Sequence, residues 1–450
     1  MTGRQLHLNA FLMEAGHHEA AWRLPESDPH ADFDLQHWIR LAQLAEAAKF
    51  DSLFLADGPV LQGTGEFRSP GQLEPLTLLT ALAGVTERIG LIATLSTTYN
   101  EPYNLARRLA SVDHVSGGRV GWNIVTSASE QEAVNFGLDE RPLHAARYER
   151  ADEFLEVVTK LWDSWADDAI VGDKDRGRWA DPDRIRPIDH RGTHFSVAGG
   201  LNVPRPVQGY PLLVQAGASE AGRQFAGKHA EAIFTAHQSL ASAQDFYADI
   251  KARATAAGRN PDHVLVLPGI VPIIGSTEAE AVARAQQLDD LRVPEYGLQA
   301  LATILEVDVA ELPLDEQLPR HVVERPRREG FVSRADLVID FATREGLTVR
   351  QVLSRLGGGR GHNVVVGTPE QVVDVLVGWF EQGAADGFNV MGAALPSGLE
   401  AFIEHVLPQL RARGLFRDEY DGLTLRDHYG LPRPANQYDR AASPRGLGGA

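Results

Sequence analysis

Short apolar segments alternate with longer helical patterns along the chain, and this alternation limits the possible folds more than any other feature. Most of the apolar segments are apolar at every position, which is typical of parallel strands buried on both faces. Eight such units predict an α/β fold that closes into a (β/α)8 TIM barrel, and an open doubly wound sheet is the alternative. The predicted strands are residues 6–12, 52–56, 89–95, 119–125, 212–215, 231–235, 264–274 and 388–391.

Two long segments interrupt this alternation. We therefore expect one barrel domain over residues 1–430, with insertions at about 167–209 and 291–361. Neither insertion has a clear helical or strand period, so both are predicted to be irregular, and the second is a candidate lid over the active site. The tail, residues 431–450, is rich in Pro and Gly. It is predicted to be poorly ordered or to lie as an extended arm on a neighbouring subunit.

Composition excludes several classes of function. The net charge of −18 argues against a nucleic-acid partner, because phosphate backbones require a basic face. The chain has no cysteine, which rules out disulfides, thiolate catalysis and cysteine-ligated zinc and fits a cytoplasmic location. The apolar segments are too short to span a bilayer, so no membrane association is expected.

Polar residues follow several predicted strands, at the end of a TIM barrel where active sites form. Asp57, Thr94 and Asn123 lie at or near the ends of the second, third and fourth strands, and His17 and His18 follow the first. Each could instead be structural, as a turn residue or a partner for barrel-end backbone groups. The two histidines lack the spacing of a metal-binding motif such as H-E-x-x-H, so no metal is predicted.

A possible anion site lies where the fifth strand meets its helix, within residues 211–236. Ala218 and Ser219 follow this strand, and Ser219 is suited to cap the helix whose positive N-terminal end could hold a phosphate. His144 and Tyr148 are four residues apart on another helix, so both could reach the same ligand. An ordinary strand-to-helix turn is the alternative. The G-x-x-x-x-G-K pattern at 222–228 is no P-loop, because a histidine follows it and its glycines lie inside the helix.

Several ordered motifs resemble one enzyme family over nearly the whole chain up to about residue 431. They include LNAFL and AGHH near the N-terminus, FDSLFLAD, IGLIATLSTTYNEPYNLAR, VDHVSGGRVGWNIVTS, RYERADEFLEVV, HFSVAGGLNVPRPVQGYPLLVQAGASEAG and VVVGTPEQVVDVLVGWFEQGAADGFNVM. These motifs are similar to the nitrilotriacetate monooxygenase component A family of the bacterial-luciferase-like superfamily. Gly200 and Val207 depart from the family pattern, which has proline at both positions, but they lie in a connecting loop.

The resemblance implies a role for each candidate residue. Asp57, Thr94 and Asn123 would line the ring and ribityl chain of FMN. The phosphate end of FMN would be held by His144, Tyr148, Ala218 and Ser219. His17 and His18 are predicted to border the substrate side, where one of them could hydrogen-bond an oxygenated flavin or exchange a proton with it.

The resemblance also implies a two-component monooxygenase. A separate NAD(P)H:flavin reductase would supply reduced FMN, which would react with O2 to form a C4a-hydroperoxyflavin and oxygenate a small organic substrate. The chain has no G-x-G-x-x-G unit after a strand, and the glycine run at 357–361 follows a helix and is interpreted as a flexible hinge. This absence agrees with reduction on another protein. We also expect a homo-oligomer, either a dimer or a tetramer.

Two alternatives of the same superfamily stay open, a deazaflavin-dependent oxidoreductase and a flavin-binding protein without catalysis. The substrate is also open, because family members act on aminopolycarboxylates, sulfones, alkanes and natural-product intermediates. Residues on variable loops decide among these classes.

Overall fold

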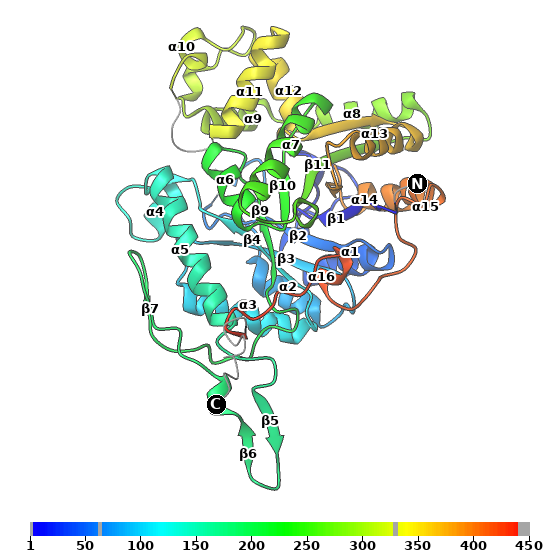
Figure 1. The fold of residues 1–450 in the computed structure, drawn as a ribbon. Helices are drawn as coiled ribbons and strands as arrows, with labels where there is room; N and C mark the ends of the chain where they lie inside the picture. Colours follow the sequence, from blue (N-terminus) through cyan, green and yellow to red (C-terminus); the bar gives the residue numbers. More distant parts are fainter. Residues whose placement is uncertain (1–2, 62–64, 327–331, 440–450) are drawn as a thin grey trace.

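Eight parallel strands close into a barrel in the computed structural model, which describes residues 3–61, 65–326 and 332–439 (Figure 1). Around the ring, β1 pairs with β2 and with β13, while β11 pairs with β13 and β10 and thereby closes the sheet. The predicted TIM barrel is confirmed. The barrel strands are β1 (His7–Phe11), β2 (Ser52–Leu55), β3 (Gly90–Ser96), β4 (Val120–Val125), β9 (Leu212–Gln215), β10 (Ala232–Thr235), β11 (Leu265–Ile274) and β13 (Gly387–Val390).

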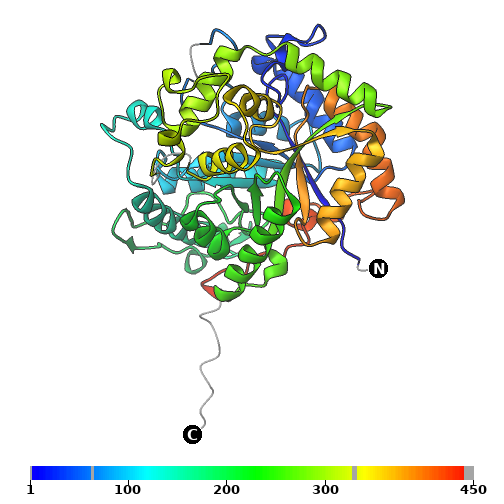
Figure 2. The same ribbon diagram turned by 90° about the horizontal axis from the view of Figure 1, so that it is seen from above.

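Helices surround this barrel, as the view of Figure 2 shows. Several begin at a side chain that caps the helix, such as Asp34 before α1 and Thr368 before α13, or at a proline such as Pro102 in α3. No helix in the described ranges is long and apolar enough to cross a membrane. The principal outer helices are α1 (Leu35–Ala47), α2 (Pro75–Ala83), α3 (Pro102–Ser116), α5 (His144–Trp162), α6 (Glu220–His229), α7 (Leu240–Ala256), α8 (Glu278–Asp290) and α13 (Pro369–Glu381); shorter ones are α4 (Glu130–Asn135), α14 (Ser397–Ala401), α15 (Leu407–Ala412) and α16 (Leu425–His428).

The strands are buried on both faces, and each face contributes to a different apolar core. Phe54, Ile92 and Val214 belong to a cluster that fills the barrel. Trp122 and Phe154 belong to a second cluster between the strands and the outer helices, and their rings are 5.9 Å apart. This double burial explains why the strands are apolar at nearly every position.

The second insertion is helical, so the predicted irregular structure at 291–361 is wrong. It contains α9 (Pro294–Leu305), α10 (Arg320–Val323), α11 (Val332–Glu345) and α12 (Val349–Gly357). These helices bury a core of their own, which includes Leu301, Val338 and Phe341. They are short and separated by loops that contain Pro313, Pro319 and Pro326, so the helical period was interrupted too often to be recognised.

The insertion covers one end of the barrel (Figures 1 and 2). The backbone N–H of Glu19, in the loop that follows β1, donates to the carbonyl of Gly357 at the end of α12. This contact places the insertion at the carboxyl end of the strands. A further strand, β12 (Asn363–Gly367), follows the insertion and pairs with the last half of β11.

The first insertion forms two small hairpins. One consists of β5 (Ile170–Asp173) and β6 (Arg178–Ala180), and the other of β7 (His190–Arg191) and β8 (Ser196–Val197). Figure 1 shows the β5–β6 hairpin projecting away from the barrel.

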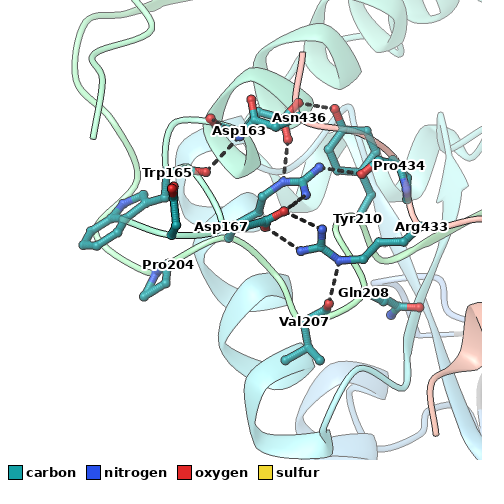
Figure 3. Close-up of polar contacts among 12 residues, drawn as sticks. Asp163, Trp165, Asp167, Pro204, Val207, Gln208, Tyr210, Arg433, Pro434 and Asn436 are labelled. Carbon is teal, nitrogen blue, oxygen red and sulfur yellow. Dashed lines mark hydrogen bonds and ion pairs between the residues drawn. The ribbon is translucent and has the colours of Figure 1, made fainter. Parts of the chain in front are cut away.

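Residues 431–439 pack against their own chain, which corrects the predicted disorder of this part of the tail; its contact with a neighbouring subunit stays a prediction. Arg433 forms an ion pair with Asp167, with nitrogen–oxygen distances of 2.6 Å, and its Nε donates to the carbonyl of Val207 (Figure 3). The buried Asn436 amide donates to the carbonyls of Asp163 and Trp165 at 3.0 and 2.9 Å. The rest of the predicted tail, residues 440–450, lies outside the described residues.

Replacing Asn436 with alanine should destabilise the fold. Two carbonyls that lie in a buried setting lose their donor, so we expect Asn436→Ala to lower the free energy of unfolding by about 1–3 kcal/mol. Urea unfolding followed by circular dichroism measures this change. The exposed Arg176→Ala variant in the β5–β6 loop is the control, and equal midpoints for the two variants would contradict a stabilising role for the tail.

Candidate active site

The ends of β3 and β4 place two polar side chains next to each other. Thr94 and Asn123 are register partners, and the Asn123 Nδ2 donates to the Thr94 Oγ1 at 2.8 Å. The Thr94 hydroxyl in turn donates to the carbonyl of Leu55 at 2.8 Å. The Asn123 Oδ1 is buried and has no hydrogen-bond donor within the described part of the chain. Because an unsatisfied buried acceptor is costly, this oxygen is well suited to accept a hydrogen bond from a ligand.

Asp57 follows β2, the strand next to β3, so it lies after the strand that the sequence predicted. Burial raises the pKa of its carboxyl to about 6, and the nearby charge of Glu74 contributes to the rise. The Gln72 amide donates to the Asp57 Oδ1 at 3.3 Å. Near neutral pH this group is therefore closer to its protonated form than an ordinary aspartate, and below pH 6 it can act as a hydrogen-bond donor.

A second polar group surrounds the N-terminus of α6, beyond the end of β9. Ser219 is the N-cap, and its Oγ accepts from the backbone N–H of Gly222 at 3.2 Å. The same oxygen lies 3.3 Å from the Nε2 of His144, whose ring centroid is 5.0 Å from that of Tyr148. Ala218 is half-buried in the same turn. Burial raises the pKa of Tyr148, so its phenol stays protonated and able to donate at neutral pH.

The turn between β9 and α6 leaves no space for a side chain at Gly217. A Cβ there would lie 2.3 Å from the Gln215 Nε2 and 2.8 Å from the Tyr148 hydroxyl, both too close for real atoms. Its backbone is thus held against the group formed by His144, Tyr148 and Ser219. A phosphate would fit this group, which offers exposed helical N–H groups, a positive helix end, and hydroxyl and imidazole donors. We call the group of His144, Tyr148, Gly217, Ala218 and Ser219 the phosphate seat.

The two candidate histidines point in different directions. His17 is buried, and its ring makes an edge contact with Phe11 at 5.0 Å between centroids. Burial lowers the pKa of His17 well below its usual range, and the charge environment of His362 and Arg68 lowers it further. The imidazole is therefore neutral at physiological pH, with its Nδ1 lacking a partner among the described residues.

His18, in contrast, is directed towards α8. Its Nδ1 accepts from the backbone N–H of Ala20 at 3.2 Å, and its Nε2 lies 3.7 Å from the Asp289 carboxylate. It lines a cavity of about 340 Å³ between α8, α12 and β12. The role of His18 beside a flavin stays a prediction, and His17 is the better placed of the two to face the barrel interior.

The order of strands places the phosphate seat and His17 on opposite sides of the barrel. Around the ring the strands follow the order β1, β2, β3, β4, β9, β10, β11 and β13. The phosphate seat follows β9 and His17 follows β1, four strands away in either direction. Thr94 and Asn123 lie between them. A ligand held by its phosphate at the seat can therefore extend past Asn123 towards His17.

Two functional candidates were missed by sequence reasoning. His362 precedes β12, and its ring stacks on Phe234 at 5.0 Å between centroids and lies 6.4 Å from His17. His237 follows β10, and burial lowers its pKa to about 4. The position of His237 just after a predicted strand was a usable signal. His362 follows the glycine run that had been interpreted only as a hinge, so no signal pointed to it.

The fold and the site together define a class of protein. A closed parallel barrel with a phosphate seat and an unpaired acceptor at one mouth is suited to a phosphate-bearing cofactor. Among the described residues, no group of three or more His, Asp or Glu side chains could hold a metal ion.

Comparison with known proteins identifies the family. The sequence profile of the luciferase-like monooxygenases matches residues 11–386. The chain is 45% identical over 436 residues to N-acetyl-S-(2-succino)cysteine monooxygenase of Bacillus subtilis (strain 168), covering 97% of this chain and 98% of the relative. It is 44% identical over 448 residues to nitrilotriacetate monooxygenase component A of Aminobacter aminovorans, with the same coverage.

A solved structure agrees with this result. A riboflavin lyase, crystallised with modified FMN and riboflavin, has a TM-score of 0.85 and 35% identity over 95% of this chain and 96% of its own. The chain therefore belongs to the luciferase-like monooxygenase family, and it is a flavin-dependent oxidoreductase. The resemblance stated from the sequence motifs is confirmed.

Removing the Ser219 hydroxyl should weaken the binding of a flavin phosphate. We expect Ser219→Ala to weaken FMN binding by roughly 1.5–3 kcal/mol, the scale of a hydrogen bond to a charged group, and to leave riboflavin binding nearly unchanged. Fluorescence titration with both flavins measures the difference. Ser239→Ala, which removes the N-cap of α7, is the matched control. An equal loss of affinity for riboflavin would show that Ser219 does not contact the phosphate.

Proposed function

We propose that this protein is the oxygenase of a two-component system, which takes reduced FMN from a separate NAD(P)H:flavin reductase and uses O2 to oxygenate a small organic substrate. The observation that carries this proposal is the phosphate seat at α6, which lies beside the unpaired Asn123 Oδ1 of the neighbouring strand β4 at the mouth of a luciferase-like barrel. FMN has a phosphate at one end and a ring that needs hydrogen-bond donors and acceptors at the other, and it matches this arrangement.

Each part of the site has a task in this proposal. His144, Tyr148 and Ser219 would hold the phosphate, while Thr94 and Asn123 would orient the ribityl chain and ring. Reduced flavin, when bound, supplies the electrons that activate O2. The protein binds and orients it, and the helical insertion covers the barrel end so that water is excluded.

Relatives support a separate partner and a small substrate. One is named component A of nitrilotriacetate monooxygenase, and another acts on N-acetyl-S-(2-succino)cysteine. We propose a flavin reductase as the partner of this chain. A cytoplasmic location and assembly into a dimer or tetramer also stay proposals, which rest on the composition and on the family resemblance.

The neutral His17 is proposed to border the substrate side of the flavin, and His18 is a second candidate. Replacing His17 with phenylalanine should keep FMN binding but raise the share of reducing equivalents lost as hydrogen peroxide, because the site would lose the neutral imidazole that can hydrogen-bond or exchange a proton on the substrate side. Peroxide and product measured together give this share. His405→Phe, at an exposed position, is the control, and unchanged coupling in both His17→Phe and His18→Phe would remove these histidines from the mechanism.

The dependence on a reductase provides the main test. The chain with NAD(P)H, FMN and O2 should consume little NAD(P)H, and an unrelated flavin reductase should restore turnover. Stopped-flow mixing of the protein, loaded with photoreduced FMN, with oxygenated buffer should reveal a transient species that is neither reduced nor oxidised FMN. A covered site slows the decay of such a species.

Other outcomes would favour the alternatives. A deazaflavin-dependent oxidoreductase would bind a deazaflavin in preference to FMN and would show no oxygen-dependent species. A flavin-binding protein without catalysis would bind FMN, but the bound flavin would oxidise as free FMN does. Either result would overturn the proposed monooxygenase.

A further inference from the structure

A cavity of about 340 Å³ lies between α8, α12 and β12, apart from the phosphate seat. Its lining includes Ser354 and Val366, which are exposed, and Asp289, whose side chain is 40% exposed. It also includes His18 and His362, which are only 3% and 4% exposed. The cavity therefore runs from the surface inwards and ends at two buried histidines.

His362 has the interior of the barrel on its other side. Its ring stacks on the half-buried Phe234 of β10 at 5.0 Å between centroids and lies 6.4 Å from the ring of His17. A Cβ at Gly269 of β11 would lie 2.5 Å from the His362 Nδ1 and 2.6 Å from the sulfur of Met391, so only glycine leaves room for the imidazole there. Met391 belongs to the apolar cluster that fills the barrel. The imidazole of His362 thus forms the wall between the cavity and the barrel interior.

The interior behind this wall is lined by aromatic rings. Phe11, Phe54 and Phe234 contact one another across the barrel, with centroid distances of 4.8, 5.2 and 5.4 Å, and we call them the aromatic floor. Phe54 is the register partner of Ile92, and Thr94 lies two residues closer to the carboxyl end on the same face of β3. The aromatic floor therefore lies one layer below Thr94, beneath the place proposed for the flavin.

Few contacts hold the His362 ring in the wall. Its Nδ1 has no hydrogen-bond partner among the described residues. Besides the stacking on Phe234, the ring has a hydrogen bond with the backbone of Thr235. The turn before it contains Gly359 and Gly361, which have no side chains to restrict the backbone. The ring can therefore leave the wall by breaking one stacking contact and one hydrogen bond.

The charged groups of the cavity are balanced by neighbouring side chains. Arg355 forms an ion pair with Glu345, and its Nε donates to the Gln238 Oε1 at 3.0 Å. The Asp289 carboxylate lies 3.5 Å from the guanidinium of Arg292. The cavity volume is at the low end of the range of about 300–1,000 Å³ for small-molecule sites. A small organic molecule fits this space, and no unbalanced charge among the described lining residues would retain it there.

We propose that the substrate reaches the flavin through this cavity and that His362 is the gate at its inner end. The inference rests on the proposed function, because it assumes that flavin lies above the aromatic floor. With the imidazole in the wall, bulk water in the cavity is separated from the reacting flavin; with the imidazole turned aside, the substrate passes. His362 acts by controlling access and takes no chemical step itself.

Removing the ring should leave the gate open. The FMN-loaded protein is mixed with dithionite under anaerobic conditions, and the loss of flavin absorbance gives the rate at which a small solute reaches the flavin. If the open state is a minor one of about 1–10%, His362→Ala should raise this rate by about 10- to 100-fold with unchanged FMN affinity. His362→Phe keeps a ring in the wall and should stay near the wild-type rate. Asn363→Ala, which lines the same cavity, is the matched control and should also stay near it.

Blocking the outer end should have the opposite effect. The chain has no cysteine, so Ser354→Cys can be labelled selectively with pyrenyl maleimide after FMN is bound. The label should slow reduction by dithionite in an otherwise unchanged chain and should reverse the acceleration in the His362→Ala background. Labelled Lys174→Cys, exposed in the β5–β6 loop, controls for the chemistry and should change neither rate.

The outcomes separate this inference from the proposed function. If the wild-type protein fails to bind FMN, the proposed function is overturned and the gate with it. If FMN binds but His362→Ala is reduced at the wild-type rate, only the gate is overturned. Equal rates before and after labelling of Ser354→Cys would show that solutes enter elsewhere and would overturn the gate even if His362→Ala does not fold.

Discussion

Closure of the parallel sheet is the constraint on which the rest of the structure depends. The pairs of β11 with β10 and with β13, and of β13 with β1, turn a row of strands into a ring. Only a ring places the loop after β9 opposite the loop after β1. In an open sheet the two loops would lie along one edge, and a single ligand could not extend from Ser219 towards His17 across a shared mouth.

The mouth of the barrel combines groups that are costly to bury. The Asn123 Oδ1 has no donor in the described ranges, and burial raises the pKa of Asp57 to about 6. Other buried polar side chains are fully engaged, as Arg119 shows by donating to the carbonyls of Ala83, Thr86 and Ile89. The Asn123 Oδ1 and the Asp57 carboxyl, by contrast, are suited to contact a ligand.

The helical insertion covers the end of the barrel where these groups lie. Its helices have their own apolar core, and the carbonyl of Gly357 at the end of α12 accepts from the backbone N–H of Glu19 in the loop after β1. One segment thus covers the barrel and contacts the loop that carries His17 and His18. In a reaction of reduced flavin with O2, such a cover would exclude water from the barrel mouth.

The sequence by itself determined the barrel and most of the residue group around Ser219 that we propose binds phosphate. Apolar runs set the strands, and Ser219 was recognisable as a cap because helix capping depends on local residues. The motifs also identified the family. Tertiary structure alone decided that His17 and His18 diverge and that His362 stacks on Phe234. These properties depend on contacts between residues far apart in the chain, which a local pattern does not encode.

The tail illustrates the same limit: its Pro-rich composition predicted disorder, whereas the contacts of Asn436 with Asp163 and Trp165, more than 270 positions away, hold it on the barrel.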